Sequence, residues 1–430
     1  MIYLLLPTLI GLLILSIAAN KKQLFSPSVI FAASFTFSAI WATAFAQDWN
    51  LKLEVATYYV ICGGVLTFIL IAKLTSYIFK STNRQKYIVS DNVYRINNSK
   101  KMFLLSVVLL AFLGSMMHVV THGLGSFSAN ISDINNMGTD LPMWLSLLRL
   151  AALWITNMAA YMIADTYVLK KKIDRFYLAI VLIGIITTAS IGGRTQAFNT
   201  LFLMLCVIYV AYEKNSKKQK TINYRLIVKI ALIFTALLYI FPRTLELMGR
   251  TSRVTDPLYY LAFYCGAEIK NLDIFISSGA IGGANSLFGE HTFSSLITWI
   301  GPYFGLDPQI SIINNYQFIN GLVLGNVYTT FYAYIYDFGY VGMIILVSLM
   351  AVISQFAYEK AIRERIDGRP QIWMIVYGYI SSTLVLSFFS NKFYEQVFYV
   401  VFVRGVIVLL IVKFILCKVK FKWLFVHNYG

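Results

Sequence analysis

The sequence has few charged residues, and this scarcity limits the classes of protein to which the chain can belong. Charged residues make up 13% of the 430 residues, whereas 58% are hydrophobic. Soluble domains rarely exceed about 50% apolar residues, so a soluble protein is excluded. Apolar stretches of about 20 residues, the length that crosses a hydrocarbon core of about 30 Å, recur along the whole chain. Because these stretches are continuous rather than alternating, they predict membrane helices and not a closed β-barrel.

Cysteine and histidine are also scarce, with four of each. The cysteines lie far apart and form no CxxC pair, so neither a zinc site nor a disulfide framework is indicated. His118 and His122 are spaced i, i+4, but no HExxH motif accompanies them, which disfavours a metal site. The chain contains no Walker A, GxSxG, GxGxxG or DxD motif. These absences disfavour an ATPase, a serine hydrolase and a soluble nucleotide-sugar transferase.

Basic residues outnumber acidic residues by 36 to 19, which gives a formal charge of +17. We attribute this excess to the positive-inside rule and not to nucleic-acid binding, because most Lys and Arg fall in alternate short loops. About 11 spans are predicted, at residues 2–19, 26–46, 55–79, 102–120, 141–168, 176–191, 196–212, 226–241, 329–358, 371–389 and 396–416. Assigning the basic loops to the cytoplasm puts the N-terminus outside and the C-terminus inside. The first apolar segment lacks a basic n-region, so we interpret it as a retained helix rather than a signal peptide.

The chain is therefore predicted to be a single polytopic membrane domain, residues 1–430, with one large external loop at residues 242–328. This loop is rich in aromatic residues, and glycine and proline mark turns at residues 282–283 and 301–302. We expect it to form short helices and turns on the outer face, packed against the spans.

Arginines on the predicted outer side are candidates for binding an anion. Arg243, Arg250 and Arg253 open the external loop at helical spacing and outnumber the one acidic residue among them, Glu246. Arg194 follows two glycines in a tight turn, where the backbone can approach an anion closely. Guanidinium groups bind phosphate bidentately. Nonspecific contact with lipid headgroups and snorkelling remain the alternative interpretations.

Candidates for a catalytic base lie in the same external loop. His291 stands beside Glu290, and a histidine next to a carboxylate can take a proton from a sugar hydroxyl. A solvated polar turn explains the pair equally well. Glu290 is a further candidate for the base, and Glu268 and Asp273, which flank Lys270 in the same loop, are secondary candidates.

The charged residues inside predicted spans include four candidates, namely Arg149, Asp165, Asp337 and Arg404. Such residues are costly in hydrocarbon, and they usually face the bundle interior or pair with one another. A buried pair between Asp337 and Arg404 is therefore an alternative to a functional role for either residue.

These features resemble the Wzy-type oligosaccharide repeat-unit polymerases, also called O-antigen polymerases. The resemblance rests on the Gly-Gly-Arg-Thr turn at residues 192–195, on the large late loop, and on two blocks at residues 326–331 and 336–342. It implies a GT-C-like membrane glycosyltransferase of the bacterial inner membrane. The enzyme would join undecaprenyl-pyrophosphate-linked oligosaccharides, as donor and acceptor, during polysaccharide biosynthesis such as that of lipopolysaccharide. It would need no metal or other cofactor, and a flippase and a chain-length regulator are the expected protein partners.

The resemblance also implies roles for individual residues. Arg194, Arg250 and Arg253 would hold the pyrophosphate, and His291 would correspond to a loop histidine of the related O-antigen ligases. Asn326, in the first block, and Asp337, in the second, are candidates that support the site together with Arg404. An O-antigen ligase and a lipid-linked oligosaccharide flippase are the alternatives. A transporter usually shows paired halves and midplane charges, whereas this sequence shows no such repeat and puts its distinctive charges at one surface.

Overall fold

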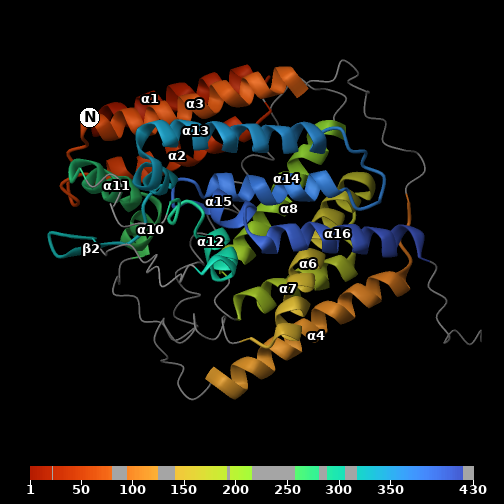
Figure 1. The fold of residues 1–430 in the computed structure, drawn as a ribbon. Helices are drawn as coiled ribbons and strands as arrows, with labels where there is room; N and C mark the ends of the chain where they lie inside the picture. The colour runs from red at the N-terminus through yellow and green to blue at the C-terminus, as the bar shows by residue number, and fades with distance from the viewer. Residues whose placement is uncertain are drawn as a thin grey trace, which may run out of the picture. The chain divides into compact units, whose positions relative to one another are not determined.

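The computed structural model describes residues 1–21, 23–79, 94–123, 141–190, 194–215, 257–279, 288–305 and 317–419. These residues are mostly helical and contain one two-stranded antiparallel sheet (Figure 1). Seven of their helices are long and apolar enough to cross a membrane, and three shorter apolar helices accompany them. The prediction of an all-α membrane protein is thus confirmed in its coarse form. The predicted span at residues 226–241 lies outside the described residues.

The helices follow the predicted spans closely. The seven long ones are α1 (Ile2–Ala19), α2 (Pro27–Ala44), α3 (Val55–Phe79), α4 (Asn98–Gly123), α6 (Met143–Lys170), α13 (Thr330–Ala361) and α16 (Val400–Lys418). The three others are α7 (Arg175–Ala189), α8 (Arg194–Asn215) and α14 (Ile372–Val385). Shorter elements between them are α10 (Pro257–Cys265), α11 (Ala267–Ser277), α12 (Ser294–Ile300), η1 (Gly301–Phe304), β1 (Gln317–Ile319), β2 (Leu322–Gly325) and α15 (Lys392–Val397).

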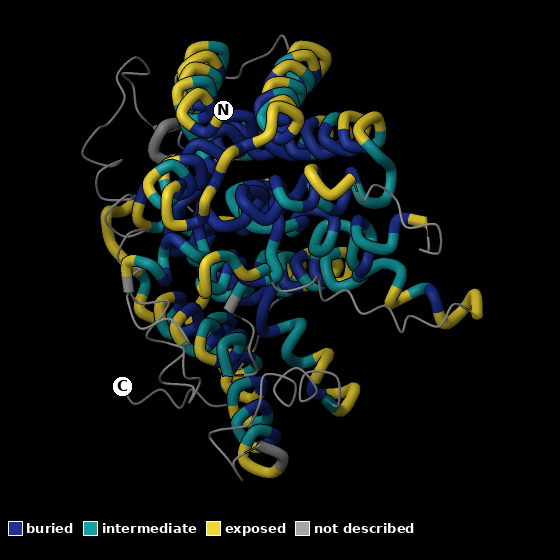
Figure 2. The backbone as a smooth tube through the Cα atoms, turned by 90° about the vertical axis from the view of Figure 1, so that its left-hand side faces the viewer, coloured by how far each residue is buried: buried dark blue, intermediate teal, exposed yellow. Residues whose placement is uncertain are grey.

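Several long helices carry exposed apolar side chains, as expected for helices in contact with lipid. Figure 2 shows exposed residues in yellow along helices whose other side is buried. The exposed apolar residues of α1 include Tyr3, Leu4, Ile10, Ile14 and Leu15, and those of α16 include Val403, Ile407, Leu410, Ile411 and Phe414. Soluble proteins rarely expose large contiguous apolar patches, so these surfaces are consistent with a hydrocarbon environment.

The chain divides into two compact units. Unit 1 comprises Met1–Thr82, Ile222–Glu359 and Ile380–Phe402, and unit 2 comprises Asn83–Thr221, Lys360–Tyr379 and Val403–Gly430. Both units contain predicted membrane helices. The proposal of a single polytopic domain over residues 1–430 stays a prediction.

Contacts within unit 1 define the relative directions of its helices. The hydroxyl of Ser16 donates to that of Ser28 over 3.0 Å, so α1 and α2 run antiparallel. Thr8 and Tyr58 share a hydrogen bond of 2.9 Å, which places the start of α1 beside the start of α3. The N-terminus and the beginning of α3 therefore lie at the same end of unit 1.

Helix α13 runs parallel to α3 (Figure 1). At its start the ring of Phe331 packs against Gly64 of α3. The approach is so close that a Cβ on Gly64 would lie 2.5 Å from this ring. Near its other end Glu359 accepts a hydrogen bond of 3.0 Å from Ser76. The beginning of α13 therefore lies at the same end of unit 1 as the beginning of α3, which agrees with the alternation expected from the loop charges.

Helices α10 and α11 gather at this same end. A Cβ on Gly266, between them, would lie 2.7 Å from the backbone nitrogen of Ala42 near the end of α2. The Oδ1 atom of Asp273 accepts hydrogen bonds of 2.8 Å from the Glu54 amide and from the Thr57 hydroxyl. Residue 273 thus satisfies donors at the start of α3, a role that a local N-cap residue usually fills.

A β-hairpin follows in the same segment and was not predicted. Its turn is Asn320-Gly321, with φ of 52° and 76°, as two-residue hairpin turns with left-handed central residues require. Asn-Gly between apolar runs is a strong hairpin signal, so the sequence did contain the information. The side chain of Asn271 in α11 donates to the carbonyls of Leu324 and Val327 over 2.9 and 2.8 Å and ties the hairpin to the helix.

A kink at Gly339 divides α13. Gly339 has φ 66° and ψ −168°, a conformation outside the helical region that glycine adopts readily. A Cβ on Gly342 would lie 2.0 Å from Cβ of Phe338, so glycine is needed there as well. The stretch after the kink, residues 340–361, is about 33 Å long at 1.5 Å per residue and suffices for a hydrocarbon core of about 30 Å. The first turns of α13, residues 330–338, are therefore not required for crossing.

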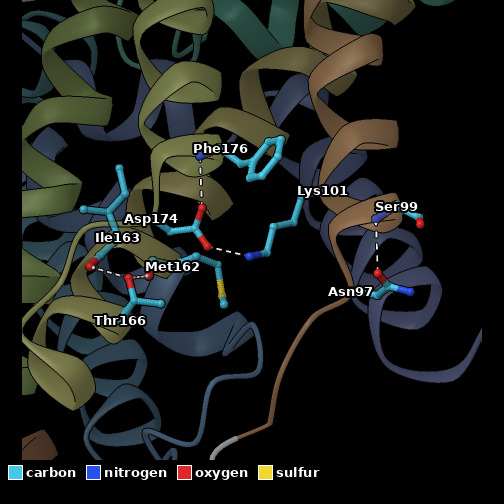
Figure 3. Close-up of polar contacts among 8 residues, drawn as sticks. All are labelled: Asn97, Ser99, Lys101, Met162, Ile163, Thr166, Asp174 and Phe176. Carbon is cyan, nitrogen blue, oxygen red and sulfur yellow. Dashed lines mark hydrogen bonds and ion pairs between the residues drawn. The ribbon is translucent and has the colours of Figure 1, made fainter. Parts of the chain in front are cut away.

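In unit 2, helices α4, α6, α7 and α8 pack against one another. Glycine permits one close approach, because a Cβ on Gly184 would lie 2.0 Å from the Thr156 hydroxyl. Figure 3 shows how α4 is joined to the start of α7. Asp174 accepts a hydrogen bond of 3.0 Å from the Phe176 amide as the N-cap of α7, and its other oxygen forms an ion pair with Lys101 of α4.

Candidate functional site

The candidate site is built on a tight turn in unit 1, residues 288–293, which we call the histidine turn. Gly289 has φ +79°, and a Cβ there would lie 3.0 Å from the Phe293 ring and 3.2 Å from the Phe338 ring. Phe293 also meets the Tyr394 ring of α15 edge-on, with centroids 5.3 Å apart. A side chain at position 289 would be strained by the positive φ and would crowd both rings, so the glycine lets the turn dock closely on the first part of α13.

Two side chains from distant parts of the chain grip the backbone of this turn. The carboxylate of Asp337 accepts from the Thr292 amide at 2.6 Å and from the His291 amide at 3.4 Å. The side-chain amide of Asn391 donates to the Thr292 carbonyl at 2.7 Å and to the His291 carbonyl at 3.2 Å. We call Asp337 and Asn391 the backbone clasp. The clasp thus binds the backbone N–H and C=O groups of both His291 and Thr292.

This geometry gives Asp337 a specific place in the site. Both of its oxygens accept hydrogen bonds from backbone amides, which accounts for a carboxylate in an apolar helix without a basic partner. Arg404, the partner considered from the sequence, is exposed on α16 and belongs to unit 2. The supporting role assigned to Asp337 is consistent with its contacts, and the role of Arg404 stays a prediction.

The clasp fixes the position of the His291 imidazole. Its Nε2 lies 3.5 Å from Oε1 of Glu290, and the two side chains are 11% and 13% exposed. The ring packs 4.2 Å from the Tyr336 ring and meets the Tyr332 ring edge-on at 5.7 Å. Burial lowers the pKa of His291, and the carboxylates of Asp337 and Glu290 oppose this effect. At pH 7 the imidazole is therefore neutral and can accept a proton.

Three tyrosines, one just before α13 and two on one face of it, lead up to His291. Tyr328, Tyr332 and Tyr336 are spaced four residues apart, and we call them the tyrosine ladder. The first two rings stack with centroids 4.4 Å apart, and the second and third are 5.8 Å apart. Gln317 of β1 donates to the Tyr328 hydroxyl at 3.0 Å, and Phe275 of α11 meets Tyr332 edge-on at 4.7 Å. The hairpin, α11 and the histidine turn thus converge on the same helix face.

Glu268 lies in a different environment from His291. It belongs to the first turn of α11, is 2% exposed, and its Oε2 has no hydrogen-bond partner among the described residues. Burial raises the pKa of its carboxyl well above the usual range. A buried, protonated carboxyl is a poor proton acceptor at neutral pH, so this placement favours His291 over Glu268 as the base.

The predicted anion-binding arginines are described only in part. Arg243, Arg250 and Arg253 lie outside the described residues. Arg194 is the first residue of α8, but its side chain also falls outside them. Asn326, the other supporting candidate, is half-buried directly after β2. The roles of all five residues stay predictions.

Arg149 is the charged span residue in unit 2 whose surroundings the structure shows best. Its Nη1 donates to the Ser115 hydroxyl at 2.7 Å and to the Thr187 carbonyl at 3.2 Å. Thr187 stands near the end of α7, and Arg194 is the first residue of the next helix, α8. The two arginines therefore belong to the same end of unit 2, with Arg149 held by neutral partners.

The sequence analysis missed Tyr332, Tyr336 and Asn391. Tyrosine at four-residue spacing was visible in the sequence, but Tyr334 interrupts the pattern and is fully buried. Asn391 had no local signal, because it acts on carbonyls 99 and 100 residues away. Such contacts become visible only when the chain is folded.

Comparison with known proteins adds no assignment, because no family model, no curated protein and no solved structure matches the chain.

Proposed function

We propose that this protein is a Wzy-type membrane glycosyltransferase of the bacterial cytoplasmic membrane. It polymerises undecaprenyl-pyrophosphate-linked oligosaccharide repeat units on the outer face. The observation that carries the proposal is the His291 imidazole, which stands beside Glu290 on a turn whose backbone the clasp holds, and whose pKa burial lowers. An imidazole with a lowered pKa beside a carboxylate can accept the proton of a sugar hydroxyl and so activate it.

The reaction forms one bond and breaks another. A hydroxyl oxygen at the non-reducing end of the acceptor attacks the anomeric carbon of the donor's first sugar. The bond from that carbon to the diphosphate oxygen breaks, and its electron pair leaves with the diphosphate. The hydroxyl proton passes to His291. Glu290, 3.5 Å from Nε2, favours a proton on that nitrogen, leaves Nδ1 as the acceptor, and stabilises the imidazolium that forms.

The departing diphosphate needs positive charge. We assign this role to Arg194, Arg243, Arg250 and Arg253, whose guanidinium groups suit bidentate phosphate binding. Stabilising a developing charge by one such donor is worth roughly 10²-fold in rate. The exposed apolar helix faces offer a surface for the polyprenyl chain.

The kink in α13 supports a site at the membrane surface. Because residues 340–361 suffice to cross the hydrocarbon core, residues 330–338 can stand at its edge. The clasp residue Asp337 belongs to this shorter piece, as do Tyr332 and Tyr336. The first sugar of a lipid-linked donor lies at this depth, which brings its anomeric carbon to the histidine turn, while its diphosphate binds the arginines.

A deletion strain distinguishes the proposed function from the two alternatives. If the protein is the polymerase, the polysaccharide ladder disappears and a product capped with one repeat unit remains. Loss of all surface glycan with accumulation of lipid-linked polymer would identify a ligase. Accumulation of single lipid-linked units facing the cytoplasm would identify a flippase.

Variants in the complemented strain test the assigned residues. We expect His291→Ala, Arg194→Ala and Arg250→Ala each to abolish long polymer and to leave the single-repeat product. Arg175→Ala removes an exposed arginine at the start of α7 and serves as a control that should keep the ladder. Normal ladders in both candidate arginine variants would refute the pyrophosphate site. Normal polymer from His291→Ala would show that His291 is not the base and that Glu290 or another residue has this role.

A further inference from the structure

Two tyrosine hydroxyls beside His291 have no hydrogen-bond partner among the described residues. Tyr332 and Tyr336 are half-buried, and their rings pack against other aromatic rings. Neither hydroxyl forms a hydrogen bond to any residue that the structure describes, whereas the hydroxyl of Tyr328, one rung earlier on the ladder, accepts from Gln317. The described part of the chain thus packs the two rings and leaves their hydroxyl groups without a hydrogen bond.

The rings of this pair are held before any ligand arrives. Tyr332 contacts the rings of Tyr328, Phe275 and His291 at 4.4, 4.7 and 5.7 Å. Tyr336 contacts the His291 ring at 4.2 Å and the Phe275 ring at 6.3 Å. Because little side-chain freedom is left to lose, a hydrogen bond to either hydroxyl carries a small entropic cost.

The position of the pair defines which kind of ligand it suits. Residues four apart on a helix are separated by about 6 Å along its axis, so the two phenols form a short row ending at the His291 ring. Among the described residues, the charges that act on both Tyr332 and His291 are the carboxylates of Glu290 and Asp337. Acidic surroundings disfavour a diphosphate or an acidic sugar and favour a neutral polyhydroxylated one.

We propose that Tyr332 and Tyr336 form a carbohydrate subsite, in which their hydroxyls hydrogen-bond a neutral sugar residue and hold it beside His291. In terms of the proposed function, on which this part depends, that sugar is the non-reducing end of the acceptor. The two tyrosines are then positioning residues that also select for the arrangement of hydroxyl groups on the acceptor.

Direct binding tests the subsite without requiring catalysis. The probe is a set of neutral oligosaccharides prepared by partial acid hydrolysis of the source cell's own surface polysaccharide. Saturation-transfer NMR on the full chain in lipid nanodiscs measures their binding. Phenylalanine keeps each ring and its packing, so Tyr332→Phe with Tyr336→Phe should weaken binding about tenfold, as expected for two lost hydrogen bonds. Tyr340→Phe, on the exposed side beyond the kink, should bind as the wild type does.

The binding results decide the subsite whatever the protein's activity. Absence of binding to the wild type, or equal binding by wild type and double variant, would overturn the inference. Thermal unfolding of each variant guards against misfolding, and Tyr336→Phe alone supplies a second, milder variant that should show a smaller loss.

Polymerisation assays separate this inference from the proposed function. With lipid-linked repeat units as substrate, the double variant should raise KM about tenfold and change kcat less, since Tyr332 and Tyr336 hold the acceptor rather than move a proton. Unchanged KM in a polymerising variant would refute the acceptor subsite while leaving the polymerase intact. Tyrosine-dependent sugar binding by a wild type that does not polymerise would refute the polymerase while leaving the carbohydrate site intact.

Discussion

Replacing Asp337 by asparagine tests whether the backbone clasp positions the base. The two carboxylate oxygens of Asp337 each accept from a different amide, at 2.6 Å from Thr292 and 3.4 Å from His291. Asparagine has only one acceptor oxygen. Its NH2 group would face one of the two backbone N–H groups, and because both are donors no hydrogen bond could form. Leaving a buried donor unpaired costs about 1–3 kcal/mol.

The effect on activity should exceed the effect on stability. A displacement of about 1 Å at a catalytic group can reduce the rate about 10²-fold, and the clasp is bonded directly to the backbone of His291. We expect Asp337→Asn to retain the fold and to lose one to two orders of magnitude in kcat/KM. Polymer formation from lipid-linked repeat units and thermal unfolding, both measured in nanodiscs, provide the two readouts.

Asp273→Asn is the matched control. Its Oδ1 alone accepts both hydrogen bonds at the start of α3, so asparagine keeps both of them and loses only the charge. This variant should keep near-normal kcat/KM. Wild-type activity in Asp337→Asn, or an equal loss in both variants, would refute the idea that the clasp positions His291.

Two further predictions follow from single contacts. Glu290→Gln removes a carboxylate that raises the pKa of His291, so the acid limb of the kcat/KM profile should move to lower pH; an unchanged or upward shift would contradict the assigned pairing. Gly342→Ala places a Cβ 2.0 Å from Cβ of Phe338, whereas a Cβ on Gly63 meets nothing within 4 Å. We expect the former to destabilise by about 1–3 kcal/mol and Gly63→Ala to be near neutral in thermal unfolding, and equal behaviour of the two would contradict the kink.

The sequence predicted most of the membrane helices because their signal is local. A run of apolar residues long enough to cross a bilayer must form a helix to satisfy its backbone groups, whatever its neighbours are. The prediction of a span at residues 55–79 therefore coincides with α3. The kink in α13 was not predicted, because glycine occurs both inside membrane helices and at breaks, and only the packing of Phe338 against Gly342 distinguishes the two.

The candidate site was predicted in its chemistry but not in its construction. His291, Glu290 and Asp337 were chosen from residue type and position, and the structure brings all three together. Asn391 could not be chosen in this way, since it reaches the turn across 99 residues. From the sequence, Glu268 and Glu290 were both candidates for the base, and only the deep burial of Glu268 distinguishes them.

What the sequence determined by itself is the class of the protein: a chain of apolar helices with a charge asymmetry between its loops. These properties depend on hydrophobicity and helix length, which each segment carries alone. The tertiary structure decided which polar groups meet. Hydrogen bonds and ring contacts act over a few ångströms, so the clasp and the tyrosine ladder exist only where folding brings distant segments to one end of unit 1.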